Sequence, residues 1–192
     1  DISEIDRVLD DAQAYVEAKD SDDTVATDLR SEALRPILAR EKPVFVNASS
    51  TGQIEAAVAW AVRRDLDIVI VGGANADRCA ALLKKHDVPV IITGTHRMPQ
   101  RRYEAYDAAF TLPARLHQAG VRFCLTTGGE AAHDRHLNHM AATAAAYGLP
   151  KDEALKMVTL SAAQIIGQGE TLGSLEAGKS ATLVLTWEAQ NT

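Results

Sequence analysis

Three histidines recur at three-residue spacing in the last third of the sequence: His133, His136 and His139. On a helix these side chains would fall within about a third of the circumference, and imidazole is a ligand that zinc, copper and iron accept. One interpretation is therefore a metal site. Three ligands on successive turns of one helix converge poorly on a tetrahedral ion, so we favour the alternative, a polar helix start that includes Asp134 and Arg135.

The segment after an apolar run at residues 90–92 is rich in cations, with His96, Arg97, Arg101 and Arg102. A guanidinium group can bind a carboxylate or a phosphate through two parallel hydrogen bonds. We therefore consider His96 and Arg97 candidates for substrate binding. The alternative is a charged loop that contacts only water, and such loops are common on protein surfaces.

A third polar group follows the apolar run at residues 121–125 and contains Thr126, Thr127, Gly128 and Glu130. Glu130 can act as a general acid or base, and the threonine hydroxyls can orient a water molecule or a substrate amide. Each also has a structural interpretation. An acidic residue in the first turn of a helix interacts favourably with the helix dipole, and buried hydroxyls usually find hydrogen-bond partners within the protein.

Glycines follow three of the apolar runs, at Gly72-Gly73, Gly94 and Gly128-Gly129. They would let backbone amides approach an anion, but tight turns between a strand and a helix explain them equally well. A free-standing nucleotide-binding domain is a weaker option. The sequence lacks the spaced G-x-G-x-x-G pattern and the acidic residue that follows it to bind a ribose.

Four short apolar runs, each followed by a helix-like segment, repeat through the middle of the chain and would position these residues. The runs cover residues 44–46, 68–71, 90–92 and 121–125. Continuous apolar runs of this length are typical of strands buried on both faces, and the alternation of strand and helix predicts an α/β fold with a parallel sheet. Four such units would form about half of a TIM-type (β/α) barrel, which has about 250 residues.

The repeat is flanked by two further segments. Residues 1–42 are predicted to form two helices, one with apolar periodicity from Ile2 to Val16 and a cap at Ser3, and one over residues 27–40 that Pro36 kinks or interrupts. Residues 43–167 would hold the half-barrel. Residues 168–192 would hold a turn-rich link and an exit strand over residues 181–185.

Composition excludes several classes of protein. The 192 residues carry 20 basic and 26 acidic side chains, a net charge of −6, which argues against binding to nucleic acid or anionic lipid. No apolar run approaches the roughly 20 residues of a membrane-spanning helix. Cys79 and Cys124 lack the paired spacing of a zinc site, and we expect both to be buried in a protein of the reducing cytoplasm. Because the first residue is Asp1, we interpret the chain as a piece of a longer polypeptide.

The tail of the sequence resembles the closing section of the amidohydrolase superfamily. The resemblance lies in residues 148–155, 158–167 and 172–184, which in that superfamily lead from the last barrel helices into a small β-sandwich. Upstream, residues 42–48, 68–72, 88–93 and 119–127 resemble barrel strands five to eight. The likeness spans nearly the whole chain and is greatest to the imidazolonepropionase-like branch, whose members are metal-dependent hydrolases of C–N bonds in cyclic amides, ureas and some dipeptides.

The resemblance also implies where metal ligands would stand. In this superfamily a divalent metal such as zinc lowers the pKa of a bound water, and its ligands include a histidine on each of strands five and six and an aspartate on strand eight. These positions fall on Asn47, on Val71 or Gly72, and on Gly128. Asparagine is a weak neutral ligand, while valine and glycine have no side-chain donor. We therefore expect no metal ligand in this half, and the cofactor stays open.

Together these observations predict an amidohydrolase-like fragment, either a hydrolase of C–N bonds other than peptide bonds or a degenerate relative of one. We expect Asn47 and Glu130 to be catalytic, and His96, Arg97, Thr127 and Gly128 to bind a small-molecule substrate. The alternative is a non-catalytic small-molecule-binding or assembly domain on the same fold. A half-barrel exposes two strand edges, so we also expect pairing with a second copy of the chain or with the missing half.

Overall fold

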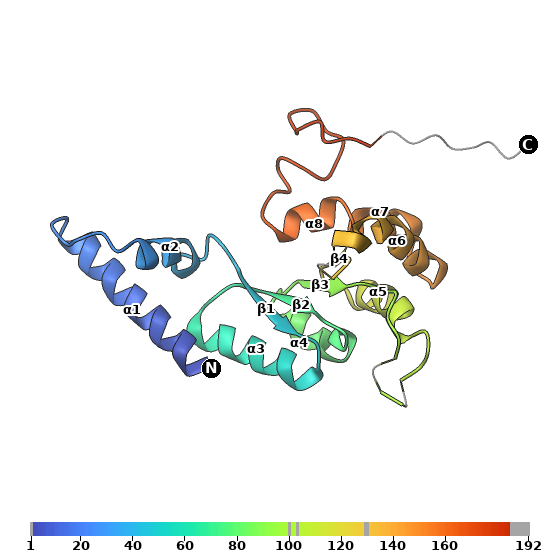
Figure 1. The fold of residues 1–192 in the computed structure, drawn as a ribbon, viewed down its shortest axis with the longest axis horizontal. Coiled ribbons are helices and arrows are strands. Elements are labelled where there is room, and N and C mark those ends of the chain that lie inside the picture. Colours follow the sequence, from blue (N-terminus) through green and yellow to red (C-terminus); the bar gives the residue numbers. More distant parts are fainter. Residues whose placement is uncertain (1, 100, 103, 129–130, 185–192) are drawn as a thin grey trace, which may run out of the picture.

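The computed structural model describes residues 2–99, 101–102, 104–128 and 131–184. Its centre is a sheet of four parallel strands in the order β1-β2-β3-β4, with a helical connection between each strand and the next (Figure 1). The strands are β1 (Val44–Ala48), β2 (Ile68–Gly72), β3 (Val90–Thr93) and β4 (Phe123–Thr126). This arrangement confirms the predicted α/β class with consecutive parallel units.

The helices also follow the predicted order. They are α1 (Ile2–Ser21), α2 (Leu29–Leu38), α3 (Thr51–Arg64), η1 (Ala76–Cys79), α4 (Ala80–Lys85), α5 (Ala108–Ala119), η2 (Ala131–His136), α6 (Leu137–Ala146), α7 (Lys151–Met157) and α8 (Leu160–Ile165). The predicted cap at Ser3 is wrong, because α1 already includes Ser3. Pro36 lies inside α2 and does not interrupt it.

The two faces of the sheet differ in their cover. On one, the helix face, the strands pack against α3, α4 and α5 through fully buried side chains that include Ile54, Val58, Leu83, Leu112 and Leu116. The other, the open face, is covered by α8 at Val69, Ile91 and Cys124. By strand alternation the open face carries Phe45, Asn47, Val69, Val71, Ile91, Thr93, Cys124 and Thr126.

The prediction that the first strand is buried on both faces is wrong. Phe45 is 49% exposed and Asn47 is also exposed, while Ala48 on the helix face is buried. The reason is position. β1 lies at the edge of the sheet, and within the described residues its open face has no covering element.

Helix α1 contacts α3 through hydrogen bonds and ion pairs. The indole nitrogen of Trp60 donates a hydrogen bond of 2.8 Å to Asp6 Oδ1, and the Arg64 guanidinium contacts Asp10 Oδ1 at 2.7 Å. These contacts place α1 and α2 beside the β1 edge, while α6, α7 and α8 lie beside β4 (Figure 1). The two ends of the sheet are therefore flanked by different helices.

The predicted exit strand does not form in the part of it that the structure describes. Residues 181–184 have no strand pairing, and Leu185 lies outside the described residues. A strand needs the backbone groups of a neighbour, and no described segment lies in register beside this one. Among the described residues, no helix is long and apolar enough to cross a bilayer.

Replacing Ile70 with alanine should lower the free energy of unfolding by about 2 to 5 kcal/mol, because Ile70 is fully buried in the helix face and its loss leaves a cavity. Val62→Ala on α3 is the matched control, since that side chain is largely exposed and should cost little. Urea unfolding followed by circular dichroism measures both. Equal losses would contradict the packing of the helix face.

Candidate functional site

The carboxyl ends of the four parallel strands meet at one edge of the sheet, which we call the carboxyl edge. It comprises residues 47–50, 71–75, 93–97 and 126–128. In open α/β sheets and barrels, ligands bind outside this end of the strands because the loops there converge. The predicted site residues that the structure describes, Asn47, His96, Arg97, Thr127 and Gly128, lie at this edge.

Asn47 is the last residue of β1 on the open face, and in the register it is paired with Val71 of β2. Thr93 and Thr126 are opposite each other on β3 and β4. Asn47 and Thr93 are exposed and Thr126 is partly buried, and none of these three side chains forms a hydrogen bond within the described part of the chain. The carboxyl edge thus offers one amide and two hydroxyls to a ligand.

Gly72 at the end of β2 has a positive φ of 107°, a conformation that side chains other than glycine rarely adopt. A Cβ at this position would lie 2.5 Å from the Ser49 hydroxyl oxygen and 3.3 Å from the Ala48 carbonyl oxygen. The next residue, Gly73, donates its backbone N–H to that same Ala48 carbonyl at 2.9 Å. The tight turn between β2 and η1 therefore accounts for these glycines, and no histidine can take the place of Gly72 without rebuilding the turn.

The start of the loop that follows β3 contacts helix α6. Thr95 is fully buried and donates a hydrogen bond of 3.2 Å to the Met140 carbonyl. The His96 ring shares a hydrogen bond of 2.8 Å with the Thr143 hydroxyl of α6. His96 and the carboxyl edge are thereby linked to α6, and the ring is held by the protein itself.

Arg97 forms an ion pair with Glu104 at 3.0 Å, and both side chains are largely buried. A guanidinium whose charge is compensated in this way is less available to a carboxylate or phosphate ligand than one in solution. The structure thus gives Arg97 a role in holding the loop of residues 95–107. Its predicted contact with a substrate stays a prediction.

At the end of β4 the Thr127 hydroxyl donates a hydrogen bond of 2.6 Å to Asp134 Oδ1 of η2. This bond ties the strand end to the following helix, so it favours the structural interpretation of that hydroxyl. Gly128 has a positive φ of 89° and is exposed, with open space where a Cβ would stand. Glu130, the predicted acid or base, lies outside the described residues.

The histidine group lies on η2 and the start of α6. The ring centroids of His133 and His136 are 6.2 Å apart, and those of His136 and His139 are 6.0 Å apart. Burial lowers the pKa of His136, with further lowering from the Arg135 cation and the neighbouring histidines. In the described part of the chain, no three histidine, cysteine or carboxylate side chains are arranged to hold a metal ion.

The two cysteines are free and buried, as predicted. Cys124 lies on the open face against Ile165 of α8, and burial raises the pKa of its thiol to about 11. The thiol therefore stays protonated at neutral pH, and a protonated thiol is a poor nucleophile or metal ligand. Cys124 contributes to packing rather than to chemistry.

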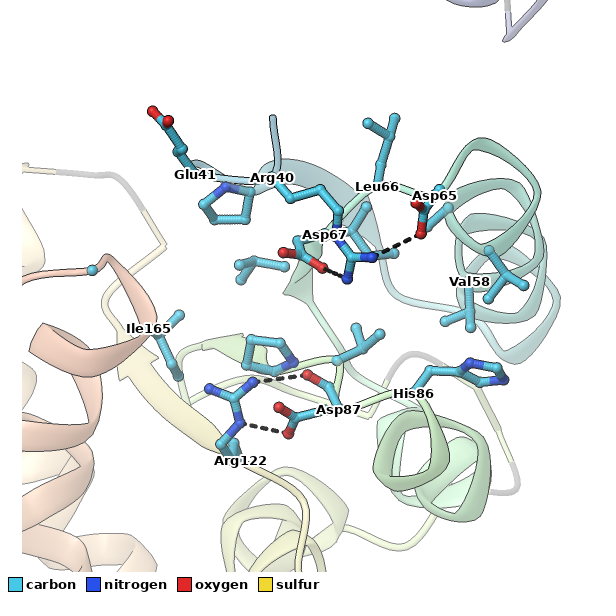
Figure 2. A pocket seen from close by; sticks show the side chains of 18 of the residues that line it. Arg40, Glu41, Val58, Asp65, Leu66, Asp67, His86, Asp87, Arg122 and Ile165 are labelled. Atoms are coloured by element: carbon cyan, nitrogen blue, oxygen red, sulfur yellow. Dashed lines mark hydrogen bonds and ion pairs between the residues drawn. The ribbon is translucent and has the colours of Figure 1, made fainter. Parts of the chain in front are cut away.

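A cavity of about 620 Å³ lies at the opposite, amino end of the strands (Figure 2). It is lined by two paired cations. Arg40 contacts Asp65 at 2.7 Å and Asp67 at 2.6 Å, and Arg122 contacts Asp87 at 2.8 Å. Sequence reasoning missed this cavity because α8, which is distant in sequence, forms one of its walls. Both of its arginines are paired with carboxylates and the cavity lies away from the carboxyl edge, so we do not place the site here.

The sequence model of the amidohydrolase family matches residues 54–191. No curated protein matches the chain. Among solved structures, an amidohydrolase from Thermotoga maritima is similar, with 24% sequence identity and a TM-score of 0.79. The match covers 93% of this chain and 48% of that one, so the chain spans about half the length of this neighbour.

Two further structures show a weaker likeness. A prolidase complexed with N-methylphosphonate-L-proline has 20% identity and a TM-score of 0.56, over 77% of this chain and 39% of its own. An adenosine deaminase from Xanthomonas campestris with bound zinc has 20% identity and a TM-score of 0.53, over 81% and 40%. At this identity the likeness concerns the fold, and it supports the interpretation of the sheet as part of a barrel.

Replacing Gly72 with histidine should destabilise the chain by at least about 1 to 3 kcal/mol, the usual cost of a strained backbone, plus the clash with Ser49. Gly52→His is the control, because Gly52 lies in α3 with open space around it. Thermal unfolding measures both variants. Adding Ser49→Gly should restore part of the loss at position 72. If Gly72→His proved as stable as Gly52→His, the turn would not be closed as described.

Proposed function

Because the chain belongs to the amidohydrolase family, we propose that it is a degenerate relative of the hydrolases that cleave C–N bonds outside peptides. In this proposal the carboxyl edge binds a small molecule without holding a metal ion. One observation carries it: the positions at which the resemblance places ligands hold Asn47, Val71 or Gly72, and Gly128. None of these residues supplies an imidazole or a carboxylate, the donors that a hydrolytic zinc site needs.

The geometry of β2 supports the same proposal. At Gly72 the backbone conformation and the Ser49 hydroxyl leave no room for a side chain. The neighbouring candidate, Val71, lies beside Asn47 on the open face, as its register partner on the adjacent strand. The side chains of this half therefore do not fit a metal centre, and we assign it no step that passes through a metal.

The free polar groups of the carboxyl edge suggest the chemical class of ligand. The Asn47 amide has donors and an acceptor, and the Thr93 and Thr126 hydroxyls can donate and accept. A neutral amide or urea group has the same mixture, so we propose that Asn47 orients such a ligand while the two threonines contact it. Gly128 would contribute open space beside them, whereas an acid or base role for Glu130 belongs to the second candidate function below.

In the same proposal the other candidates shape the wall of the site. His96 is held by Thr143, Arg97 by Glu104 and Thr127 by Asp134. These contacts fix the loops after β3 and β4 relative to α6. We infer that these three side chains position the carboxyl edge and act on a ligand only indirectly, without contacting it.

A second candidate function is retained hydrolysis of C–N bonds by a complete protein whose metal ligands all lie outside this chain. The observation in its favour is that the carboxyl edge is open. Asn47 and Thr93 are exposed instead of being covered by apolar side chains. A site that had lost all contact with substrate would have no need to keep polar side chains accessible there.

The full-length protein should contain much less than one zinc, iron or manganese ion per chain, and should not hydrolyse a panel of cyclic amides, ureas and acyl dipeptides that includes hydantoin. Binding of the same panel should be detectable as a rise in unfolding temperature. Because Asn47 supplies the orienting amide, Asn47→Ala should abolish that rise.

Gln164→Ala on α8 is the control, since this exposed amide lines the cavity at the opposite, amino end of the strands. It should leave the response to the panel intact. One metal ion per chain together with turnover would establish the second candidate. No rise in unfolding temperature with any compound of the panel would contradict binding at the carboxyl edge.

A further inference from the structure

The short helix η2 is a weakly held segment beside the carboxyl edge. It has six residues, and residues 132–135 are exposed, so apolar burial contributes little to its stability. A 3₁₀ helix also has poorer hydrogen-bond geometry than an α-helix. The hydrogen bond between Thr127 and Asp134 ties η2 to the end of β4. A segment of this kind opens locally at a small cost in free energy.

Within η2 the imidazole of His136 is a hydrogen-bond acceptor. Arg135 Nε donates a hydrogen bond of 3.3 Å to His136 Nε2. A guanidinium group can only donate, so Nε2 carries the lone pair and the hydrogen of the neutral ring is on Nδ1. Protonation of Nε2 removes this lone pair, breaks the bond and leaves two cations side by side. The contact therefore exists only while His136 is neutral.

The groups around His136 also oppose its protonation. In the described part of the chain these groups are Arg135, His133, His139 and His96. The ring centroids of His133 and His139 lie 6.2 Å and 6.0 Å from that of His136. Each of these neighbours is a cation or becomes one in mild acid. The carboxylate of η2 is already engaged by the hydroxyl at the end of β4.

His96 responds differently, although it belongs to the same group of side chains. The Thr143 hydroxyl donates its only hydrogen to the His139 carbonyl at 2.9 Å, so it must accept from His96 Nε2. Nε2 carries a hydrogen in the neutral ring of His96 and in its charged ring alike. The contact between the loop after β3 and α6 therefore survives protonation, whereas the contact inside η2 does not.

We propose that η2 is a pH-sensitive switch at the rim of the carboxyl edge, held closed by neutral His136 and released when that ring is protonated. Because burial and the neighbouring cations lower the pKa of His136 in the closed form, the open segment binds a proton more readily than the closed one. The closed form is therefore fully stabilised above the ordinary histidine pKa of about 6.5. It loses this stabilisation as the pH falls below that value.

The switch borders the edge that the proposed function assigns to a ligand. Thr127, which holds η2 through Asp134, directly follows Thr126, one of the two hydroxyls proposed to contact the ligand. Loosening of η2 therefore frees the segment that holds Thr126 and Gly128 in place, and we expect weaker ligand binding in mild acid. This consequence rests on the proposed function, whereas the switch itself does not.

The full-length protein with ¹⁵N-labelled histidine tests the switch. Nuclear magnetic resonance should show the hydrogen of the neutral ring on Nδ1 in His136 and on Nε2 in His96. Amide hydrogen exchange, corrected for the intrinsic rate, should show the protection of residues 131–136 falling about threefold or more from about pH 7.5 to about pH 5.5. His136→Gln keeps an acceptor that cannot be protonated and should abolish this fall. His86→Gln, at the amino end of the strands, is the control and should retain it.

Unchanged protection across this pH range would overturn the switch, and so would a fall that persists in His136→Gln, because another group would then titrate. Arg135→Gln is a second test. It should lower the protection at the higher pH toward the value at the lower pH, and it should raise the titration midpoint of His136. Arg135→Gln with the protection and the midpoint of the unmodified protein would overturn the role of the guanidinium.

The ligand arm uses the panel of cyclic amides, ureas and acyl dipeptides. These compounds should raise the unfolding temperature less in mild acid than at neutral pH, and His136→Gln should remove this difference. A ligand response that does not change with pH, although the protection of η2 does, would overturn the link between the switch and the site. A change in protection without any ligand response at either pH would support the switch and count against the proposed function alone.

Discussion

The parallel pairing of four short strands is the constraint on which the rest of this structure depends. Parallel neighbours cannot be joined by a tight turn, so each strand is followed by a helical crossover that packs on the helix face. The same pairing brings all carboxyl ends to one edge. The register then decides which side chains meet there, with Asn47 opposite Val71 and Thr93 opposite Thr126.

The open face is divided between packing and access. Toward the amino ends, α8 places Ile165 against Val69 and Cys124, and both arginines of the adjoining cavity form ion pairs with carboxylates. Toward the carboxyl ends, the polar side chains stay accessible. This division is physically reasonable, because apolar burial at one end stabilises the sheet while the other end can keep groups whose hydrogen bonds a ligand completes.

The departure from a metal centre has a different physical basis at each position. At Asn47 and Gly128 the change is one of side-chain chemistry, and space remains around both. At Gly72 it extends to the backbone, since a positive φ and the Ser49 hydroxyl together exclude any larger residue. These differences are the physical basis of our proposal that the carboxyl edge binds neutral hydrogen-bonding groups rather than a cation.

The sequence by itself determined the features that depend on neighbours along the chain. Apolar runs ending in glycine or polar turns marked the four strands, apolar periodicity marked the helices, and the pattern of residues 148–184 indicated the family. The residues of the carboxyl edge could be predicted because the end of each strand is marked by the residues that follow it directly in the sequence. The departures were a boundary at Ser3, which lies within its helix, and the predicted exit strand, which has no pairing over residues 181–184.

Tertiary structure alone decided what each of those residues contacts. Whether β1 is covered depends on the presence of an element beside it, and Phe45 is half exposed because the described chain has none there. The partners of His96 and Thr127 are Thr143 and Asp134, and the sequence does not indicate which side chains a loop will meet when it folds back on a helix. Burial and hydrogen bonding are set by contacts between distant segments, so they follow only once the whole chain has packed.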